Sequence, residues 1–187
     1  MLKSPVLETN DLIIKEIEFK DARDMYEYAS LPEVGPMAGW ETHTSVRYSR
    51  MIIRMQREKN KGNIPAVFAI HLKDSGKMIG TCELYAFSTD DKSAELGYTI
   101  SPYYQNRGYA TQAAKAMMEF GFNSIKLDRI ICTTFPNNLA SKRVIEKCDF
   151  RFVREKKNGY VLYDGTIHDL LVYELTKKEY EELNNGV

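Results

Sequence analysis

The residues best suited to do chemistry are the six at 105–110, which read Gln-Asn-Arg-Gly-Tyr-Ala. They follow an apolar stretch that ends at Ile100, and they open an Ala- and Met-rich stretch that predicts a helix. The first backbone N–H groups of a helix have no partner within it, and the helix dipole favours negative charge beside them. Because Gly108 and Ala110 carry little or no side chain, an anion can approach the backbone closely. We therefore predict a phosphate-binding loop built from main-chain amides.

The loop sequence limits which phosphate compound is expected. No Lys-Ser or Lys-Thr pair follows Gly108, so a nucleoside-triphosphate loop with bound magnesium is not indicated. The anion would be held by amides and by the helix dipole, which suits a diphosphate that is not itself the reaction centre. Arg107, Lys142 and Arg143 could also meet phosphate oxygens, although solvated surface positions are the simpler explanation for all three.

Two stretches of the chain resemble a known superfamily. Gln-x-x-Gly-x-Ala after a strand that ends Gly-Tyr-x-Ile is similar to the coenzyme A signature of the GNAT (GCN5-related N-acetyltransferase) superfamily. Residues 136–141 and 146–150 resemble its second motif, and residues 164–173 resemble the branch of ribosomal-protein N-terminal acetyltransferases. The resemblance spans nearly the whole chain. It implies an N-acetyltransferase that uses acetyl-CoA as co-substrate and needs no metal.

The resemblance also implies roles for single residues. Glu95, on the strand before the loop, would be the general base, with Glu83 and His168 as alternatives; a solvated strand-end carboxylate is the other interpretation of Glu95. Ser141 would hydrogen-bond to the departing sulfur, unless its hydroxyl only bonds the helix backbone. The coenzyme would be bound by Tyr98, Ile100, Gln105, Arg107, Gly108, Tyr109, Ala110, Thr111 and Asn138.

The acceptor implied by the family is a primary amine, which attacks a thioester only when it is neutral. Deprotonation at pH 7 costs about 1.4 kcal/mol for an N-terminal α-amine and about 5 kcal/mol for lysine. A modest general base is therefore enough for an α-amine, and direct transfer agrees with the lack of a convincing Cys–His pair. The acceptor pocket is predicted to be lined by Gly39, Trp40 and His43. The alternative for Trp40 is that it only anchors the hydrophobic core.

Three other functions stay open at this stage, and the weakest of them is another nucleotide-handling enzyme that uses the same anion-binding loop. The acceptor could be a small-molecule amine such as a polyamine, an aminoglycoside or an amino acid, since fold analogy cannot choose the substrate. A domain that binds acyl-CoA as a sensor, without turnover, is the second alternative. The carboxylates of Glu83 and Glu95 and the hydroxyl of Ser141 favour an enzyme.

The elements that position these residues follow from the hydrophobic pattern, in the order β-α-α-β-β-β-α-β-α-β-β. Helices are expected over residues 21–30, from near Thr44 to Lys59, over 107–122 and over 138–148, and an irregular passage is expected at 31–40. Asp149 stands where relatives usually carry Gly, and aspartate tolerates a left-handed backbone. The pattern predicts a mixed α/β fold: one domain over residues 1–187 with a central mixed sheet of about seven strands and helices on both faces.

Composition excludes several classes of protein. The 187 residues carry 26 basic and 26 acidic side chains, so neither a nucleic-acid scaffold nor a polycation binder is indicated. No stretch suits a membrane span or a secretion signal. The three cysteines and three histidines are scattered, which predicts no disulfide framework and no metal site. We expect a cytoplasmic protein, with a homodimer expected only from the family.

Overall fold

The computed structural model describes residues 5–61 and 67–185 of the chain. These residues form two compact units. The first unit runs to Glu83 and also contains residues 98–116, and the second contains residues 84–97 and the chain from Met117 onward. The prediction of a single domain over residues 1–187 stays a prediction.

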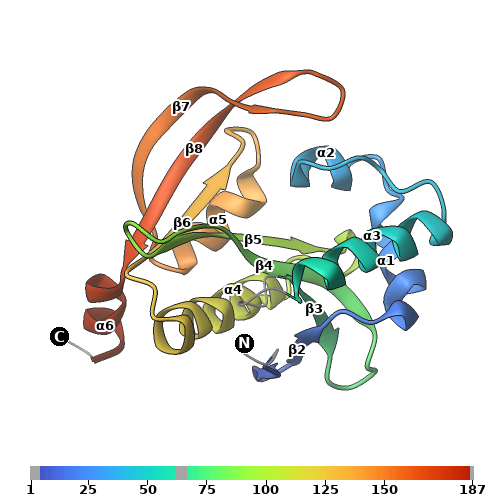
Figure 1. Ribbon diagram of the computed structural model, residues 1–187, viewed down its shortest axis with the longest axis horizontal. Coiled ribbons are helices and arrows are strands. Elements are labelled where there is room, and N and C mark those ends of the chain that lie inside the picture. The colour runs from blue at the N-terminus through green and yellow to red at the C-terminus, as the bar shows by residue number, and fades with distance from the viewer. Residues whose placement is uncertain (1–4, 62–66, 186–187) are drawn as a thin grey trace. The chain divides into compact units, whose positions relative to one another are not determined.

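The strands form one mixed sheet in the order β1-β2-β3-β4-β5-β6-β8-β7 (Figure 1). The pair β5–β6 is parallel, whereas β1–β2, β2–β3, β3–β4, β6–β8 and β7–β8 are antiparallel. The predicted mixed α/β class is therefore confirmed. The expected count of about seven strands is one too low, because the two-residue β1 was not expected. The strands are β1 Leu7–Glu8, β2 Leu12–Glu16, β3 Val67–Leu72, β4 Met78–Ser88, β5 Ser93–Ile100, β6 Arg129–Thr134, β7 Arg151–Val161 and β8 Ile167–Thr176.

The helices flank this sheet. They are η1 Phe19–Asp21, α1 Ala22–Ala29, α2 Val34–Ala38, α3 Val46–Lys59, η2 Pro102–Tyr104, α4 Tyr109–Glu119, the π-helical η3 Phe120–Ile125, α5 Leu139–Lys147 and α6 Lys177–Asn185. Among the described residues, no helix is long and apolar enough to cross a membrane.

The prediction of an irregular passage at residues 31–40 was wrong, because it contains α2. Pro36 lies in the first turn of α2, where backbone N–H groups have no helical partner and proline removes nothing. Gly39 ends the helix in a left-handed conformation at φ 82°. Val34 is buried in the core of the first unit, so a short helix is stabilised here by tertiary packing.

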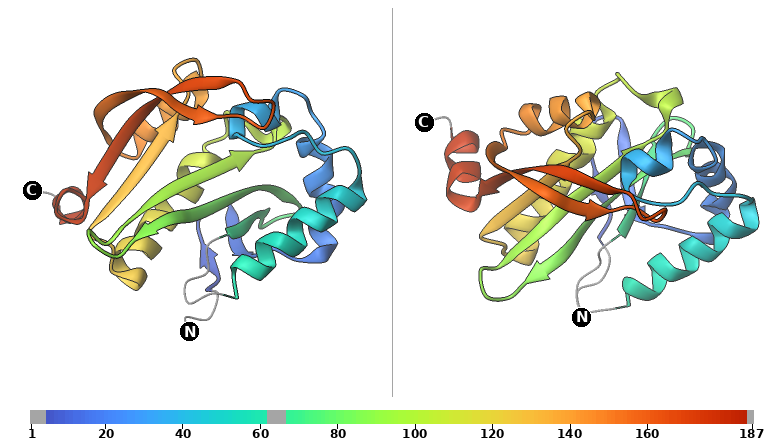
Figure 2. Two further views of the ribbon diagram at one scale, coloured as in Figure 1. Left: turned by 45° about the horizontal axis from the view of Figure 1, so that its top comes forward. Right: turned by 90° about the horizontal axis from the view of Figure 1, so that it is seen from above.

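In the first unit, α1 and α3 lie side by side (Figures 1 and 2) and pack on strands β3 and β4. Ser45 is the N-cap of α3, and its hydroxyl accepts the Tyr48 backbone N–H at 3.1 Å. Ile53 is fully buried against Met25 and Tyr28 in the core of this unit. The N-terminal end of α3 is thereby fixed, which matters for the surface described below.

In the second unit, β7 and β8 form a long hairpin (Figure 2). The turn lies at residues 162–166, where Gly165 has a φ of 84°. Strand β8 lies between β7 and β6, and it pairs with β6 over six residues from Arg129 to Thr134.

Candidate active site

The chain between β5 and α4 has the backbone expected of a phosphate-binding loop. After η2, Asn106 and Gly108 both adopt left-handed conformations, at φ 61° and 81°, and α4 begins at Tyr109. A Cβ added to Gly108 would meet no atom within 4 Å. Glycine is thus needed at 108 for its backbone angle, and the space beside it is open to a ligand.

The amides of this loop are its main chemical feature. Across residues 5–61 and 67–185, no group accepts a hydrogen bond from the backbone N–H groups of residues 106–111. The first amide of α4 that bonds within the chain is that of Gln112, which donates to the Gly108 carbonyl at 3.0 Å. Residues 101–111 contain no Asp or Glu, and the α4 dipole adds positive potential. The loop can therefore hold a diphosphate.

Side chains of the loop hold it in place. The Gln105 amide donates to the Ile100 carbonyl at 3.3 Å, which ties the loop to the end of β5. The exposed Arg107 guanidinium lies 5.6 Å from the Tyr104 ring centroid. Tyr98, Tyr109, Ala110 and Thr111, four further residues predicted to contact the coenzyme, are half-buried, and Ile100 is buried.

Gly80 on β4 is a residue that the sequence analysis missed. A Cβ there would lie 2.1 Å from the Thr99 carbonyl oxygen of β5, so only glycine allows the backbones to approach this closely. The Ser101 N–H donates to the Ile79 carbonyl at 2.8 Å at the same place. The end of β5 is therefore held firmly where the loop begins.

In the second unit, Glu95 is a half-buried carboxylate at the middle of β5. Its Oε2 accepts the Tyr85 hydroxyl at 3.0 Å and the Thr133 hydroxyl at 3.4 Å. Both donors were missed from the sequence, since they come from the neighbouring strands β4 and β6. They fix the orientation of the carboxylate through one oxygen.

Asn138 and Ser141 also lie in the second unit, at the start of α5. Asn138 is the N-cap of α5, and its side-chain oxygen accepts the Ser141 backbone N–H at 3.0 Å. The cap holds the two residues together on the first turn of the helix. It uses the oxygen of Asn138 and the main chain of Ser141, so the Asn138 NH₂ group and the Ser141 hydroxyl take no part in it.

Comparison with known proteins identifies the family. The family profile described as "Acetyltransferase (GNAT) domain" matches residues 11–151. The chain belongs to the GNAT acetyltransferase family. Its resemblance to this superfamily is confirmed, and the chain is an N-acetyltransferase.

Relatives of this GNAT acetyltransferase span most of the chain. The uncharacterized N-acetyltransferase YnaD of Bacillus subtilis (strain 168) is 35% identical over 145 residues, which are 78% of this chain and 82% of YnaD. A GNAT-family acetyltransferase from Bacillus anthracis is 27% identical with a TM-score of 0.80, over 94% of this chain and 100% of that one. RimJ of Mycobacterium smegmatis, in complex with CoA-disulfide, shares the fold with a TM-score of 0.77 at 21% identity, over 94% and 89% of the two chains.

The thiols of this GNAT acetyltransferase are poorly suited to be nucleophiles. Cys82, Cys132 and Cys148 are all free and buried. Burial raises the pKa of the Cys82 and Cys132 thiols, so neither is a thiolate at neutral pH. Within the described chain, no group of three or more His, Cys, Asp or Glu could hold a metal ion.

The two alternative bases lie in different surroundings. Glu83 ends the first unit on β4, and burial raises the pKa of its carboxyl group, although Lys59 partly opposes this. His168, on β8 in the second unit, contacts the Thr166 hydroxyl at 3.0 Å and packs 5.3 Å from the Phe135 ring. Its raised pKa makes the Glu83 carboxylate a stronger base than an ordinary carboxylate, and His168 stays the other alternative.

The residues predicted to wall the acceptor pocket form one group in the first unit. The His43 ring lies between Trp40, at 5.2 Å, and Tyr48, at 5.1 Å between ring centroids. His43 Nδ1 is 2.8 Å from the Ser49 hydroxyl, and burial lowers the His43 pKa from 6.5 to about 4. His43 is therefore neutral at pH 7. Trp40 is half-buried against the core, which is compatible with both interpretations of this residue.

Proposed function

We propose that this enzyme moves an acetyl group from acetyl-CoA directly to a primary amine, with the loop at residues 105–110 binding the diphosphate of the coenzyme. The observation that carries the proposal is the run of backbone N–H groups at 106–111 that no described group accepts. The CoA-disulfide held by RimJ, which shares this fold, supports coenzyme A as the ligand. Asn138, through its NH₂ group, is proposed to bond the pantetheine arm.

In the proposed reaction the neutral amine attacks the thioester carbonyl carbon. The carbon–sulfur bond then breaks, the sulfur leaves with the bonding electrons, and the amine proton passes to a base. We assign the base role to Glu95, because two hydroxyl donors hold one of its oxygens and orient the other. The Ser141 hydroxyl would hydrogen-bond to the departing sulfur. A thiolate is a good leaving group because the pKa of a thiol is about 8.5, so this hydrogen bond is enough. Glu83 is the alternative base.

The acceptor we propose is the N-terminal α-amine of a polypeptide, a ribosomal protein among the candidates. Its deprotonation at pH 7 costs about 1.4 kcal/mol, against about 5 kcal/mol for a lysine side chain. A single oriented carboxylate can more easily remove the proton from the amine that costs less free energy to deprotonate. Buried, reduced thiols agree with the proposed cytoplasmic location. A homodimer stays a prediction.

The test is an assay of thiol release from acetyl-CoA with a panel of acceptors: peptides with free N-termini, peptides with only lysine amines, polyamines, aminoglycosides and amino acids. We expect release above background with free N-termini. Release only with small amines would move the acceptor to that class. Binding of acetyl-CoA without release on any acceptor would indicate the sensor module, and absence of binding would contradict the assignment of the loop.

A further inference from the structure

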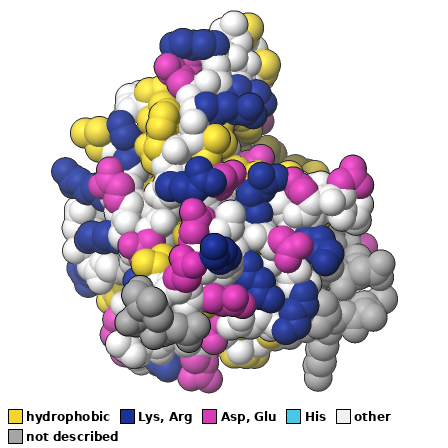
Figure 3. Space-filling view, turned by 90° about the vertical axis from the view of Figure 1, so that its left-hand side faces the viewer, with side chains coloured by type: hydrophobic (Ala, Val, Ile, Leu, Met, Phe, Trp, Pro, Cys, Tyr) yellow, Lys and Arg dark blue, Asp and Glu magenta, His cyan; other side chains and the backbone are white. Residues whose placement is uncertain are grey.

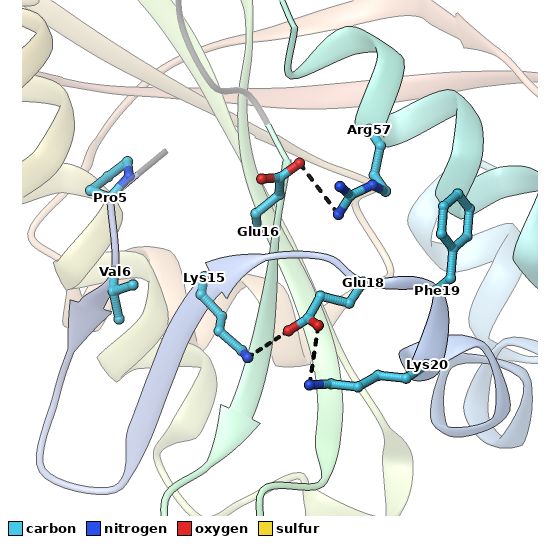
Figure 4. A pocket seen from close by; sticks show the side chains of 8 residues that line it. All are labelled: Pro5, Val6, Lys15, Glu16, Glu18, Phe19, Lys20 and Arg57. Carbon is cyan, nitrogen blue, oxygen red and sulfur yellow. Dashed lines mark hydrogen bonds and ion pairs between the residues drawn. The ribbon is translucent and has the colours of Figure 1, made fainter. Parts of the chain in front are cut away.

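Two surface hollows of the first unit differ in their charges. One, of about 590 Å³, is lined by Pro5, Val6, Lys15, Glu16, Glu18, Phe19, Lys20 and Arg57 (Figure 4). Its cations have carboxylate partners: Glu18 lies 2.7 Å from Lys15 and 3.1 Å from Lys20, and Arg57 lies 3.4 Å from Glu16. Hydrogen bonds from Lys15 and Lys20 lower the pKa of Glu18. The charges of this hollow are balanced by its own side chains.

The other hollow has cations only. It measures about 530 Å³, runs along the first half of α3, and is lined by Thr44, Ser45, Arg47, Tyr48, Arg50, Met51 and Arg54. Within the part of the chain that the structure describes, Arg47, Arg50 and Arg54 have no Asp or Glu at ion-pair distance. Three positive charges beside one hollow thus have no ion-pair partner, and the Glu41 carboxylate reaches its lining only at the Tyr48 hydroxyl, 3.5 Å away.

These arginines form a stripe on α3. Spacings of three and four residues bring Arg47, Arg50 and Arg54 to one side of the helix, away from the buried Ser49 and Ile53. We call the surface formed by the three arginines and Met51 the arginine face. Met51 is 47% exposed, so the face offers apolar contact as well as charge.

Two features hold the arginine face in place. The Arg50 guanidinium lies 5.4 Å from the Phe19 ring centroid, a contact that positions it without neutralising it. Ser45 caps the N-terminus of α3, so the positive end of the helix dipole lies beside Arg47. The positive potential is therefore built on a fixed helix rather than on a loop.

The arginine face adjoins the predicted acceptor wall through Tyr48. This residue lines the hollow and also packs edge-on against His43, which in turn contacts Trp40. We infer that the arginine face binds an acidic segment of the polypeptide acceptor, close in sequence to the amine that is acetylated. The inference rests on the proposed function and adds a substrate class to it: polypeptides with acidic residues near the N-terminus.

The size of the face sets the length of this segment. Arg47 and Arg54 are seven residues apart on α3, a distance of about 10 Å along the helix axis. An extended peptide covers that distance in about three residues. Two carboxylates two or three residues apart, with an apolar residue between them, would match the arginines and Met51.

The composition favours a polypeptide over a nucleic acid as the partner. Arginine and methionine are both enriched at protein interfaces. The chain has equal numbers of acidic and basic residues, so its composition lacks the basic excess typical of nucleic-acid binding. On the one face of the molecule that Figure 3 draws, acidic and basic side chains are interleaved.

The test compares two peptides that differ only in charge, one with Glu at positions 5 and 7 and the other with Gln. With the full chain we expect about tenfold higher kcat/KM for the acidic peptide, an advantage that falls as salt is raised. The double variant Arg47→Gln/Arg54→Gln should lose this advantage and keep its turnover of the Gln peptide. The charge-matched control Arg23→Gln/Lys178→Gln should keep the advantage.

A binding measurement separates this inference from the proposed function. Fluorescence anisotropy of a labelled, N-acetylated acidic peptide reports binding without turnover. Weaker binding by the Arg47→Gln/Arg54→Gln variant, and not by the control, supports the arginine face whatever the catalytic result. Equal binding by both variants, or displacement of the peptide by single-stranded RNA at lower concentration than by an acidic peptide, would overturn it. Loss of thiol release on every peptide, with binding retained, would count only against the proposed function.

Discussion

The backbone N–H of Gln112 donates to the carbonyl of Gly108 at 3.0 Å, and this bond is where α4 begins to satisfy its own amides. The N–H groups of residues 106–111 precede it, and no described group accepts a bond from them. A helix start usually has a capping side chain on some of these groups. No side chain among the described residues caps these groups, so in the proposed function they are free to bind the coenzyme diphosphate, and a change at Gly108 should alter that binding.

We expect Gly108→Ala to weaken acetyl-CoA binding at least tenfold. The new Cβ would stand in the open space beside the amides, and it would strain a backbone held at φ 81°. Isothermal titration calorimetry measures the change in Kd, and thermal unfolding measures the strain.

Gly76→Ala is the matched control for this variant. Gly76 lies in the turn between β3 and β4 at φ 69°, and a Cβ there also meets nothing within 4 Å. Both substitutions should cost about 1–2 kcal/mol of stability. A Kd that changes equally in both variants would show that the effect at Gly108 is general strain, and the loop would lose its assigned role.

We expect Glu95→Gln to lower kcat by about 10²-fold and to leave the Kd for acetyl-CoA unchanged. A positioned general base contributes roughly 10²–10⁴-fold, and glutamine cannot take the proton. The amide can still accept a hydrogen bond from the Tyr85 hydroxyl, so the local structure should survive. Steady-state kinetics with the true acceptor provides the measurement.

Glu83→Gln is the comparison that decides between the two carboxylates. Because burial raises the pKa of Glu83, a reaction that depends on it should lose rate as pH falls through a value above about 4.5. If Glu83→Gln removes this loss of rate at low pH from the pH–rate profile and Glu95→Gln does not, the base is Glu83 and our assignment is wrong.

We expect Ser141→Ala to lower kcat about tenfold without unfolding α5. The cap of α5 uses the main-chain N–H of Ser141, which alanine retains. Asn138→Ala is the contrasting variant, because it removes the capping oxygen and should cost about 1 kcal/mol of stability. A kcat for Ser141→Ala within error of the unmodified enzyme would remove the proposed contact with sulfur.

The parts of the site that the sequence predicted are those determined by local rules. A strand ending at Ile100, then Gly108 and an Ala-rich helix, were enough to predict where the loop at residues 105–110 lies, because helix starts and glycine conformations depend on few neighbours. The hydrophobic pattern likewise predicted the mixed sheet.

The parts that were missed depend on register and tertiary packing. The Tyr85 and Thr133 donors reach Glu95 only because β4 and β6 bring them to it, and single-sequence patterns do not specify that register. Helix α2 is too short to be stable alone, so its existence depends on the burial of Val34. The Asn138 cap could have been predicted, since asparagine before a helical pattern is an N-cap signal.

We expect the stability of the enzyme to fall between pH 6.5 and about 4 in part because of His43. Burial lowers the folded-state pKa of His43 to about 4, so in this range the unfolded chain binds a proton that the folded chain does not. The contribution of neutral His43 to the free energy of unfolding is fully present above pH 6.5. It is lost as pH falls toward 4, and the loss is at most about 3 kcal/mol. Urea unfolding at pH 7 and pH 5 measures it, and His43→Gln should flatten the difference between the two pH values. An unchanged pH dependence would contradict the role of His43.

Helix α5 is followed by a residue with a left-handed backbone conformation, since Asp149 has a φ of 62°. The Asp149 N–H donates to the Glu146 carbonyl at 3.0 Å and the Phe150 N–H to the Ile145 carbonyl at 3.2 Å, which together form a Schellman motif. Ile145 and Phe150, at the two positions that usually form the hydrophobic pair of this motif, are both buried. The tolerance of aspartate for this conformation, predicted from the sequence, is confirmed.

Because aspartate only tolerates this position, we expect Asp149→Gly to raise the free energy of unfolding by about 0.5–1 kcal/mol. Part of the gain would be electrostatic, since a negative charge beside the C-terminal end of α5 opposes the helix dipole. Asp149→Asn removes the charge and keeps a residue that accepts the left-handed backbone, so it should give a smaller gain. Asp149→Ala should destabilise, because alanine is strained at positive φ. Urea unfolding of the three variants and of the unmodified enzyme should give free energies of unfolding that fall in the order Gly, Asn, Asp, Ala at position 149. If the alanine variant is as stable as the unmodified enzyme or more stable, the backbone angle does not limit stability here.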